Sequence, residues 1–341
     1  MGSVKDLSIL REPTLADPGL GQFHFSDRYS VFDWGEMPDQ IPQKGRALCI
    51  MSAYFFEKLE AMGFRTHYEG IVENGVVKRL KDAKAPAEAI QVKLVRVVRP
   101  ELINSHFDYR VFQKERSNFL IPLEIIYRNS LPDGASVFKR LREGSLTLSD
   151  LGLSEMPSPG SKLKRPILDV STKLEKIDRY LGWQEARAIA GISPVELDEL
   201  KNAALVINRL ITDSAERAGL INEDGKVEFA YDQNRKLMLV DVLGTPDECR
   251  FTYEGLPVSK EVARIYYRKS AWYRDLEEIK KKDSVNWKNL VKSRPEPLPK
   301  RFLELTSLAY QSCADELTGR AWFKAPPLGE ILTGIKEFLN S

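Results

Sequence analysis

Residues 225–244, GKVEFAYDQNRKLMLVDVLG, contain two apolar runs separated by the polar turn DQNR. Apolar runs bounded by turn residues predict two strands that form a hairpin. Side chains alternate between the faces of a strand, so Lys226 and Glu228 point to one face. Val227 and Phe229 point to the other face. This pattern is typical of any half-buried strand, and it also places two charged groups side by side.

Asp241 closes the second apolar run of this hairpin. A carboxylate at the end of a buried strand is costly unless a cation pairs with it. Glu228 on the neighbouring strand offers a second carboxylate, and Mg²⁺ binds one or two carboxylates together with water and phosphate oxygens. The two acids are therefore candidate metal ligands. The alternative is that Asp241 only caps a turn.

Strand signals dominate the first third of the chain and helix signals the last third, which predicts an α+β fold and not a doubly wound sheet. Asn74-Gly75 predicts a hairpin turn. Residues 154–166 are rich in Pro and Gly and predict a loop, and residues 99–118 predict an irregular surface insertion. The other expected strands cover residues 90–98 and 119–129, and the expected helices cover residues 46–63, 194–218, 260–282, 300–318 and 327–340.

Two of these helices carry specific local signals. Ser193, Pro194 and Glu196 predict a capping box at the start of the helix that ends before Gly219. The helix over residues 46–63 should bury an apolar stripe, because its apolar residues recur at spacings of three and four. This stripe consists of Leu48, Met51, Phe55, Leu59 and Met62.

The composition excludes several classes of protein. The 341 residues include 51 Lys and Arg against 49 Asp and Glu, so no basic footprint for nucleic acid is present. Three Cys and three His, widely scattered, fit neither a zinc site nor a disulfide framework. No apolar run approaches the ~18 residues of a membrane helix, and the N-terminus lacks a secretory pattern. We expect a cytoplasmic protein without membrane or nucleic-acid partners.

Two arginines directly follow or border predicted strands. Arg128 follows the run IPLEIIY, and Arg250 lies in GTPDECRF. The planar guanidinium matches phosphate and carboxylate groups, so both are candidates for anion binding. Ser136 lies in a turn of small residues whose backbone N–H groups suit an oxyanion. The alternative is that the arginines are solvated strand ends.

Four strings occur in the order found in one known family. They are SDRYSVFDWGEMPDQIPQKG (26–45), IPLEIIYRN (121–129) followed by Ser136, LDVSTKLEKID (168–178) and LVDVLGTPDECRF (239–251). Together they resemble the motifs of the SAICAR synthetase family of purine biosynthesis, over roughly residues 22–275. One such string is weak evidence, but four in the family order are specific.

The resemblance implies a kinase-like antiparallel sheet that covers ATP, a larger α+β domain and C-terminal helices. The expected boundaries are residues 1–120, 121–275 and 276–341. The implied activity is an ATP-dependent ligase that joins L-aspartate to the carboxylate of carboxyaminoimidazole ribotide (CAIR), giving SAICAR, ADP and phosphate. ATP, Mg²⁺ and these small molecules are the implied ligands of a monomer or homodimer.

The resemblance also assigns residues. Glu228, Asp241 and Lys226 are implied to be catalytic, the two acids as metal ligands, and Lys5 joins the acids at ATP. The residues implied to bind the substrate are Ser30, Asp33, Arg128, Ser136, Lys173, Asp178, Lys226, Asp247 and Arg250.

The sequence departs from the family pattern in places. Ser3 replaces the first lysine of the phosphate-binding loop, so another cation of the first 100 residues is expected to compensate; Arg11, Lys44 and Arg96 are the candidates. The alternative is that Lys5 and Mg²⁺ suffice. Val242 replaces a glutamate beside Asp241. Three alternatives therefore stay open: a kinase-like phosphotransferase, a ligase for a different carboxylate, and a non-catalytic nucleotide-binding relative.

Overall fold

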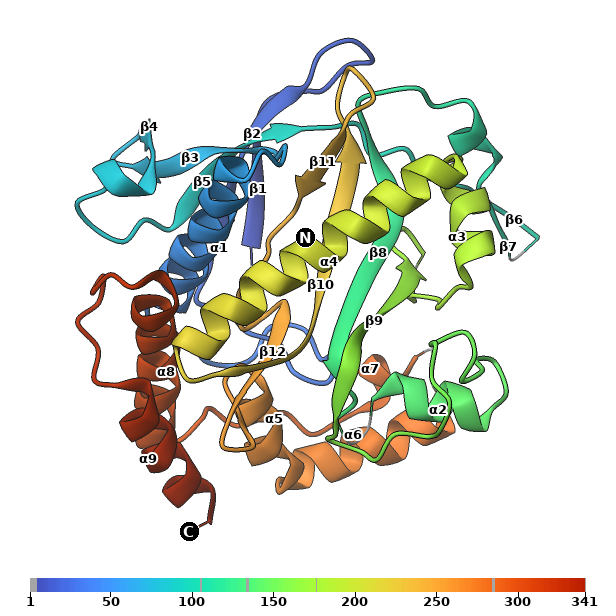
Figure 1. Cartoon of the computed structure of the whole chain (residues 1–341). Coiled ribbons are helices and arrows are strands. Elements are labelled where there is room, and N and C mark those ends of the chain that lie inside the picture. Colours follow the sequence, from blue (N-terminus) through green and yellow to red (C-terminus); the bar gives the residue numbers. More distant parts are fainter. Residues whose placement is uncertain (1–4, 105, 133–134, 176, 284–285, 341) are drawn as a thin grey trace.

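The computed structural model describes residues 5–104, 106–132, 135–175, 177–283 and 286–340, and it contains two large antiparallel sheets surrounded by helices (Figure 1). The predicted α+β class is confirmed. The first sheet has the strand order β1-β2-β5-β3-β4. Its strands are β1 (Lys5–Arg11), β2 (Gly19–Phe25), β3 (Tyr68–Glu73), β4 (Val76–Lys78) and β5 (Ala89–Leu94).

The hairpin between β3 and β4 confirms the turn signal. Asn74 and Gly75 have φ angles of 52° and 76°. A two-residue hairpin turn requires positive φ at both positions, which Asn and Gly adopt at little cost. The strand predicted over residues 90–98 ends earlier, because β5 stops at Leu94 and the chain then crosses toward the second sheet.

The helix α1 (Lys44–Ala61) packs against the first sheet. Four of the five predicted stripe residues are buried, but Met62 is 53% exposed. The prediction for Met62 was wrong because the helix ends at Ala61, and the turn at Gly63, whose φ is 89°, directs Met62 into solvent.

The second sheet has the strand order β13-β12-β10-β8-β9, and β11 pairs with β10 away from this path. Its strands are β8 (Phe119–Ser130), β9 (Lys162–Thr172), β10 (Ile221–Tyr231), β11 (Leu237–Val240), β12 (Cys249–Tyr253) and β13 (Leu256–Pro257). The expected loop over residues 154–166 is therefore too long, because β9 begins at Lys162 and extends the ladder along β8.

The helix α4 (Pro194–Arg217) crosses β8 and β10 and covers one face of the second sheet (Figure 1). The predicted capping box is confirmed: the Ser193 hydroxyl accepts from the Glu196 backbone N–H, and the Glu196 carboxylate accepts from the Ser193 N–H. The opposite face of the sheet is left uncovered by α4.

The C-terminal helices are α5 (Glu261–Arg268), α6 (Ala271–Lys282), α7 (Trp287–Leu290), α8 (Lys300–Thr318) and α9 (Leu328–Asn340). The single helix expected over residues 260–282 is broken, because the Ser270 hydroxyl accepts from the Tyr273 N–H and starts α6 as a new helix. α8 lies between α1 and α9 (Figure 1). The domain boundaries after residues 120 and 275 stay a prediction.

The insertion between the two sheets is more regular than predicted. It contains the hairpin β6 (Glu101–Ile103) and β7 (His106–Asp108) and the 3₁₀ turn η2 (Arg110–Gln113). The remaining elements are η1 (Leu80–Asp82), α2 (Ser136–Arg142) and α3 (Trp183–Ala190). Within the described ranges, no helix combines the length and the apolar composition that a membrane crossing would need.

Candidate functional site

The strand β10 carries a row of charged side chains. Asp224, Lys226 and Glu228 occupy alternate positions, so they share one face of the second sheet. In the ladder with β8, Asp224 is opposite Arg128 and Glu228 is opposite Glu124. At ~3.3 Å per residue along a strand, the backbone positions of Asp224 and Glu228 are about 13 Å apart. The charged face therefore has two separate ends.

Asn129 of β8 identifies the orientation of this face. Its amide Nδ2 donates to Oδ1 of Asn208 on α4 over 2.9 Å. Because neighbouring strand residues point to opposite faces, Arg128 points away from α4. The charged row thus lies on the face of the sheet that α4 leaves uncovered.

The two predicted metal ligands meet at one end of the charged row. Asp241 directly follows β11, and Glu228 is paired with Val240 in the neighbouring ladder. Lys5 forms an ion pair with Asp241, and Nζ of Lys173 lies 2.6 Å from Oε1 of Glu228. The structure thus brings together the predicted ATP residues and adds Lys173 to them.

The electrostatics of this pair favour a divalent cation. Burial raises the pKa of Glu228 well above its usual range, and the charge of Asp241 adds to this effect. Burial also opposes ionisation of Asp241, but the ammonium groups of Lys5 and Lys173 outweigh it and lower the pKa of Asp241. Two buried carboxylates that share a few cations gain from additional positive charge.

The donor set fits a magnesium ion that arrives with a nucleotide. Glu228 and Asp241 offer hard oxygen ligands, and Mg²⁺ needs only one or two of these when phosphate and water oxygens complete its shell. Among the described residues, no group of three or more His, Cys, Asp or Glu side chains is arranged to hold a metal. A cage made of protein ligands alone is therefore absent from this part of the chain.

His67 supports the backbone of Asp241. Asp241 has a φ of 66°, an uncommon angle for a residue with a side chain. Burial lowers the pKa of His67 to about 4, so the ring is neutral near pH 7. Its Nε2 lies 3.0 Å from the Asp241 carbonyl oxygen and donates to it. This bond helps to keep the Asp241 carboxylate turned toward Glu228.

Lys226 occupies the middle of the charged row. Its Nζ lies 3.1 Å from Glu124, 3.5 Å from Glu248 and 3.8 Å from Glu228. Burial disfavours the ammonium form, yet these carboxylates together raise the pKa of Lys226 well above its usual value. Lys226 is therefore a permanent positive charge between the two ends of the row.

A cavity of about 320 Å³ opens between the first sheet and the carboxylate pair. Its lining combines apolar side chains with the charged side chains of Lys93, Lys173, Glu228 and Asp241. Such a mixed cavity suits a heterocycle with attached phosphates. The lining residues are Leu7, Ile9, Glu12, Pro13, Phe23, His67, Lys93, Leu94, Val95, Val97, Leu120, Lys173, Glu228, Val240 and Asp241.

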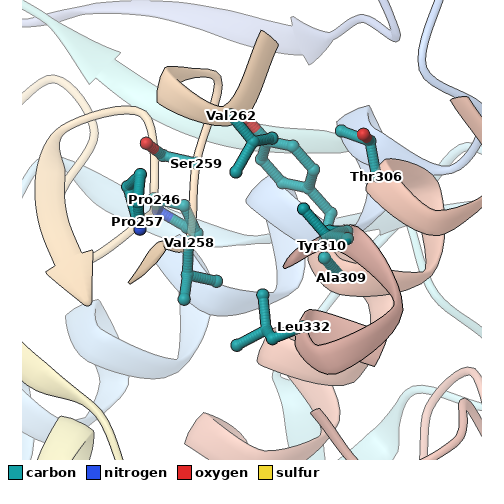
Figure 2. Close-up of a pocket in the computed structure, with 10 residues that line it drawn as sticks. Pro246, Pro257, Val258, Ser259, Val262, Thr306, Ala309, Tyr310 and Leu332 are labelled. Atoms are coloured by element: carbon teal, nitrogen blue, oxygen red, sulfur yellow. The ribbon is translucent and has the colours of Figure 1, made fainter. Parts of the chain in front are cut away.

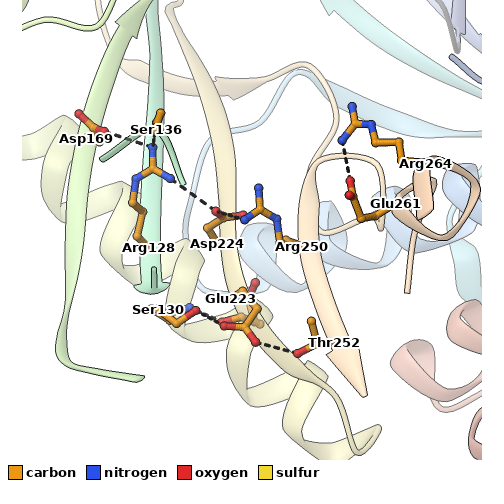
Figure 3. Close-up of polar contacts among 12 residues, drawn as sticks. Arg128, Ser130, Ser136, Asp169, Glu223, Asp224, Arg250, Thr252, Glu261 and Arg264 are labelled. Carbon is orange, nitrogen blue, oxygen red and sulfur yellow. Dashed lines mark hydrogen bonds and ion pairs between the residues drawn. The ribbon is translucent and has the colours of Figure 1, made fainter. Parts of the chain in front are cut away.

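The other end of the row is an arginine cluster (Figure 3). Arg128 and Arg250 flank Asp224, each with a guanidinium nitrogen 3.5 Å from its carboxylate. The Arg128 guanidinium also lies 3.3 Å from the Ser136 hydroxyl, which in turn donates to Tyr180. Two guanidinium groups gathered around one carboxylate, with two hydroxyls beside one of them, bring together the donors that a phosphate group needs.

Asp169 keeps Arg128 in this position. Its carboxylate lies 3.2 Å from Arg128 and 2.6 Å from Arg140 of α2. Arg140 also stacks on the Tyr180 ring. The cluster therefore carries three arginines against two aspartates, which leaves an excess of positive charge for an anionic ligand.

The structure leaves three predicted substrate residues without a contact to these clusters. Ser30 is half-buried in the segment between β2 and α1. The side chain of Asp33 is 88% exposed and lies 3.8 Å from Lys280 of α6. Asp178 is exposed but lies close enough to the charged row that partial burial and the charge of Glu124 raise its pKa, against the opposing charges of Lys226 and Lys173. Their roles stay predictions.

Asp247 is separate from the other predicted residues. Its side chain is 2% exposed, and it pairs over 2.9 Å with Lys44, whose side chain is fully buried. Burial opposes ionisation, but Lys44 outweighs it and lowers the pKa of Asp247 to about 2. The structure gives this carboxylate no open path to a substrate.

This ion pair should make the chain sensitive to acid. A carboxylate whose pKa is lower in the folded chain stabilises the fold above its unfolded pKa and loses this effect as the pH falls. At 1.36 kcal/mol per pKa unit, Asp247 contributes about 2 kcal/mol at pH 7 and about half of this at pH 3. Urea unfolding should therefore show a gap between wild type and Asp247→Asn that is about 1 kcal/mol smaller at pH 3 than at pH 7. An equal gap at both values would contradict the depressed pKa.

The cations expected to replace the missing lysine do not reach the cavity. Ser3 lies outside the described residues. Lys44 is bound to Asp247, Arg96 pairs with Glu115, and Arg11 donates to the Pro18 carbonyl. None of the three lines the cavity, and whether one of them reaches a bound nucleotide stays a prediction. Lys93 and Lys173 line the cavity instead.

Sequence reasoning missed Glu124, Asp224 and Asp169 of the charged face. Alternation on β8 and β10 could have found the first two, because Glu124 shares a face with Arg128 and Asp224 shares a face with Lys226. Asp169 gave no such signal, because its contact with Arg128 depends on how β9 pairs with β8.

The family profile described as SAICAR synthetase matches residues 14–281. A chain of Archaeoglobus fulgidus, provisionally named a phosphoribosylaminoimidazole-succinocarboxamide synthase, is 49% identical over 340 residues that span both chains completely. The phosphoribosylaminoimidazole-succinocarboxamide synthase of Thermoplasma acidophilum is 31% identical over 307 residues, which cover 88% of this chain and 93% of the relative.

Solved structures show the same fold. The SAICAR synthase of Saccharomyces cerevisiae, in complex with SAICAR, superposes with a TM-score of 0.65 at 22% identity and covers 95% of each chain. A SAICAR synthetase in complex with ADP superposes with a TM-score of 0.55 at 22% identity and covers 87% of this chain and 99% of the other.

Proposed function

The chain belongs to the SAICAR synthetase family, and from this membership we propose that it joins L-aspartate to the carboxylate of CAIR at the expense of ATP. The terminal phosphoryl group of ATP passes to the CAIR carboxylate and gives an acyl phosphate and ADP. The aspartate amine then attacks the acyl carbon, and phosphate leaves as SAICAR forms. The aspartate ammonium group releases two of its three N–H protons, one before the attack and one as the amide forms, and the amide nitrogen keeps the third.

The observation that carries this proposal is the charged row on β10. Its two ends lie about 13 Å apart by strand geometry, so the arginine end can hold the phosphate of a ribotide while the carboxylate end holds the nucleotide. The CAIR phosphate binds at Arg128, Arg250 and Ser136, and the ring carboxylate then lies near Lys226. The acyl acceptor is thereby directed toward the carboxylate pair.

ATP occupies the cavity between the two sheets, with its base in the apolar part and its phosphates toward Lys5 and Lys173. Glu228 and Asp241 would hold Mg²⁺, which neutralises phosphate charge when bound. The protein's own task is to align donor and acceptor and to offset the charge that develops on the transferred group. Lys226 stands where this charge develops, between the two ends of the row.

The test is an ADP-release assay with the purified chain, ATP, Mg²⁺, CAIR and L-aspartate, in which each substrate is omitted in turn. The proposal requires that ADP release depends on both CAIR and aspartate and that SAICAR accumulates in equal amount. Release with CAIR alone would identify a phosphotransferase. Release that requires aspartate together with a carboxylic acid other than CAIR would identify a different ligase, and nucleotide binding without release would identify a non-catalytic relative.

Two further expectations stay proposals. The cytoplasm is the expected compartment, in line with the composition and with the expected substrates. A monomer or a homodimer is the expected assembly, and sedimentation of the purified chain distinguishes between them. No nucleic-acid or membrane partner enters this function.

A further inference from the structure

We infer that Asp247 serves the reaction indirectly: with Lys44 and Tyr310 it forms a buried anchor that positions the turn leading to Glu248 and Arg250. This inference rests on the proposed function. It assigns positioning roles to Lys44 and Tyr310, and it replaces a direct substrate contact of Asp247 by an action through its neighbours.

The anchor joins three distant segments of the chain. Nζ of Lys44, the first residue of α1, lies 2.9 Å from Oδ2 of Asp247. The Tyr310 hydroxyl of α8 donates to Oδ1 over 2.8 Å. The Lys44 side chain is fully buried, and the whole Tyr310 residue is only 2% exposed. Both oxygens of Asp247 are thus used inside the protein.

The turn held by this anchor leads into the charged face. The backbone N–H groups of Glu248 and Cys249 both donate to the Thr245 carbonyl, over 3.0 and 2.8 Å. The next side chains then face the site: Glu248 lies 3.5 Å from Lys226, and Arg250 lies 3.5 Å from Asp224. A shift of the Asp247 carboxylate would therefore move one contact at the centre of the row and one at its arginine end.

The turn has little room to shift. Gly244, with a φ of 67°, lies so close to α1 that an added Cβ would be 2.1 Å from the Phe55 ring. On the other side, Figure 2 shows Pro246 of the turn facing Tyr310 of α8 and Leu332 of α9. The gap between them has a volume of about 10 Å³, which holds at most one water molecule. A shift of the anchor would therefore displace the beginning of β12 at Cys249.

A buried ion pair is an expensive way to gain stability, since apolar residues of similar size often serve as well. Tyr310 supplies what apolar packing does not, a directional hydrogen bond to Oδ1 of Asp247, while Lys44 offsets the buried charge from the side of Oδ2. The anchor also gives the C-terminal helix α8 a role in the site, although α8 contributes no residue to the charged row.

The test compares Tyr310→Phe with Tyr68→Phe. Each variant removes one buried tyrosine hydroxyl that donates to a carboxylate, Asp247 in the first case and Glu57 in the second. Calorimetric titration should show CAIR affinity reduced about threefold or more in Tyr310→Phe, with ATP affinity within about twofold of wild type. Tyr68→Phe should leave both affinities unchanged. Unchanged CAIR affinity in Tyr310→Phe overturns the inference.

A double-mutant cycle tests whether the anchor acts as a unit. If it does, Asp247→Asn combined with Tyr310→Phe weakens CAIR binding little more than Asp247→Asn alone. Additive effects would mean that Tyr310 and Asp247 act independently, which overturns the inference. Lys44→Met should reproduce the selective loss of CAIR affinity if it folds, and Tyr310→Phe carries the test if it does not.

Failure of the proposed function gives a different result. If the wild-type chain does not bind CAIR, the proposed function is contradicted. The anchor is then tested with a second ligand. Inorganic phosphate at the arginine cluster then serves as the ligand, read as the rise in melting temperature. Tyr310→Phe should diminish this rise and Tyr68→Phe should keep it; equal rises in both variants overturn the anchor.

Discussion

Replacing Asp241 by Asn should lower the rate of ADP release with Mg²⁺-ATP by roughly a hundredfold or more, a loss of several kcal/mol of transition-state stabilisation. Asparagine keeps the shape of the side chain but removes its charge. The nucleotide's cation then has one anionic ligand, Glu228, in place of two. Lys5 also loses its partner, so the charge at the phosphate end of the cavity changes as well.

Asp232→Asn provides the matched control. Asp232 lies in the turn between β10 and β11, and its carboxylate accepts hydrogen bonds from the backbone N–H groups of Asn234 and Lys236. It is absent from the cavity lining, so its loss changes the net charge equally without touching the site. Steady-state ADP release and thermal melting are measured on both variants. A folded Asp241→Asn chain with a turnover within about threefold of wild type, less than 1 kcal/mol, excludes Asp241 as a ligand.

Local signals predicted the parts of the fold that short segments determine. The capping box at Ser193 and the turn at Asn74-Gly75 depend on a few adjacent residues, and the structure confirms both. Alternation on β10 placed Lys226 and Glu228 on one face for the same reason. These predictions need no knowledge of what packs against the segment.

The remaining features depend on contacts between distant segments. Asp247 has no local signal for burial, because Lys44 and Tyr310 reach it from α1 and α8. The beginning of β9 was missed since only pairing with β8 makes Lys162 part of a strand. Family resemblance identified the motif around Asp247 but could not say which atoms its carboxylate touches.

The two arginines of the phosphate-binding cluster should respond differently to replacement by alanine. Arg250 is 40% exposed and Arg128 is 5% exposed. Arg250→Ala should change stability by less than about 1 kcal/mol, because its pair with Asp224 is partly solvated. It should nevertheless raise the KM for CAIR about tenfold to a hundredfold, since a charge-assisted contact with phosphate contributes roughly 1.5–3 kcal/mol.

Arg128→Ala should lose stability as well as affinity. Its removal leaves Asp169 with Arg140 alone and Asp224 with Arg250 alone. Burial already raises the pKa of Asp224, and breaking a buried charge network costs about 3–5 kcal/mol. Urea unfolding therefore separates the two variants, whereas in both of them the KM should rise for CAIR and not for ATP.

Arg264→Ala completes the comparison. Arg264 lies on α5 near the cluster and pairs with Glu261 over 2.8 Å (Figure 3). The Arg264→Ala variant loses the same positive charge, but Arg264 does not belong to the arginine cluster. The KM of this variant for CAIR should therefore equal that of wild type. If Arg250→Ala and Arg264→Ala change the KM for CAIR equally, the change comes from the loss of net positive charge, and the cluster does not bind the CAIR phosphate. If ATP affinity falls in Arg250→Ala while CAIR affinity does not, the two ends of the charged row hold the opposite ligands.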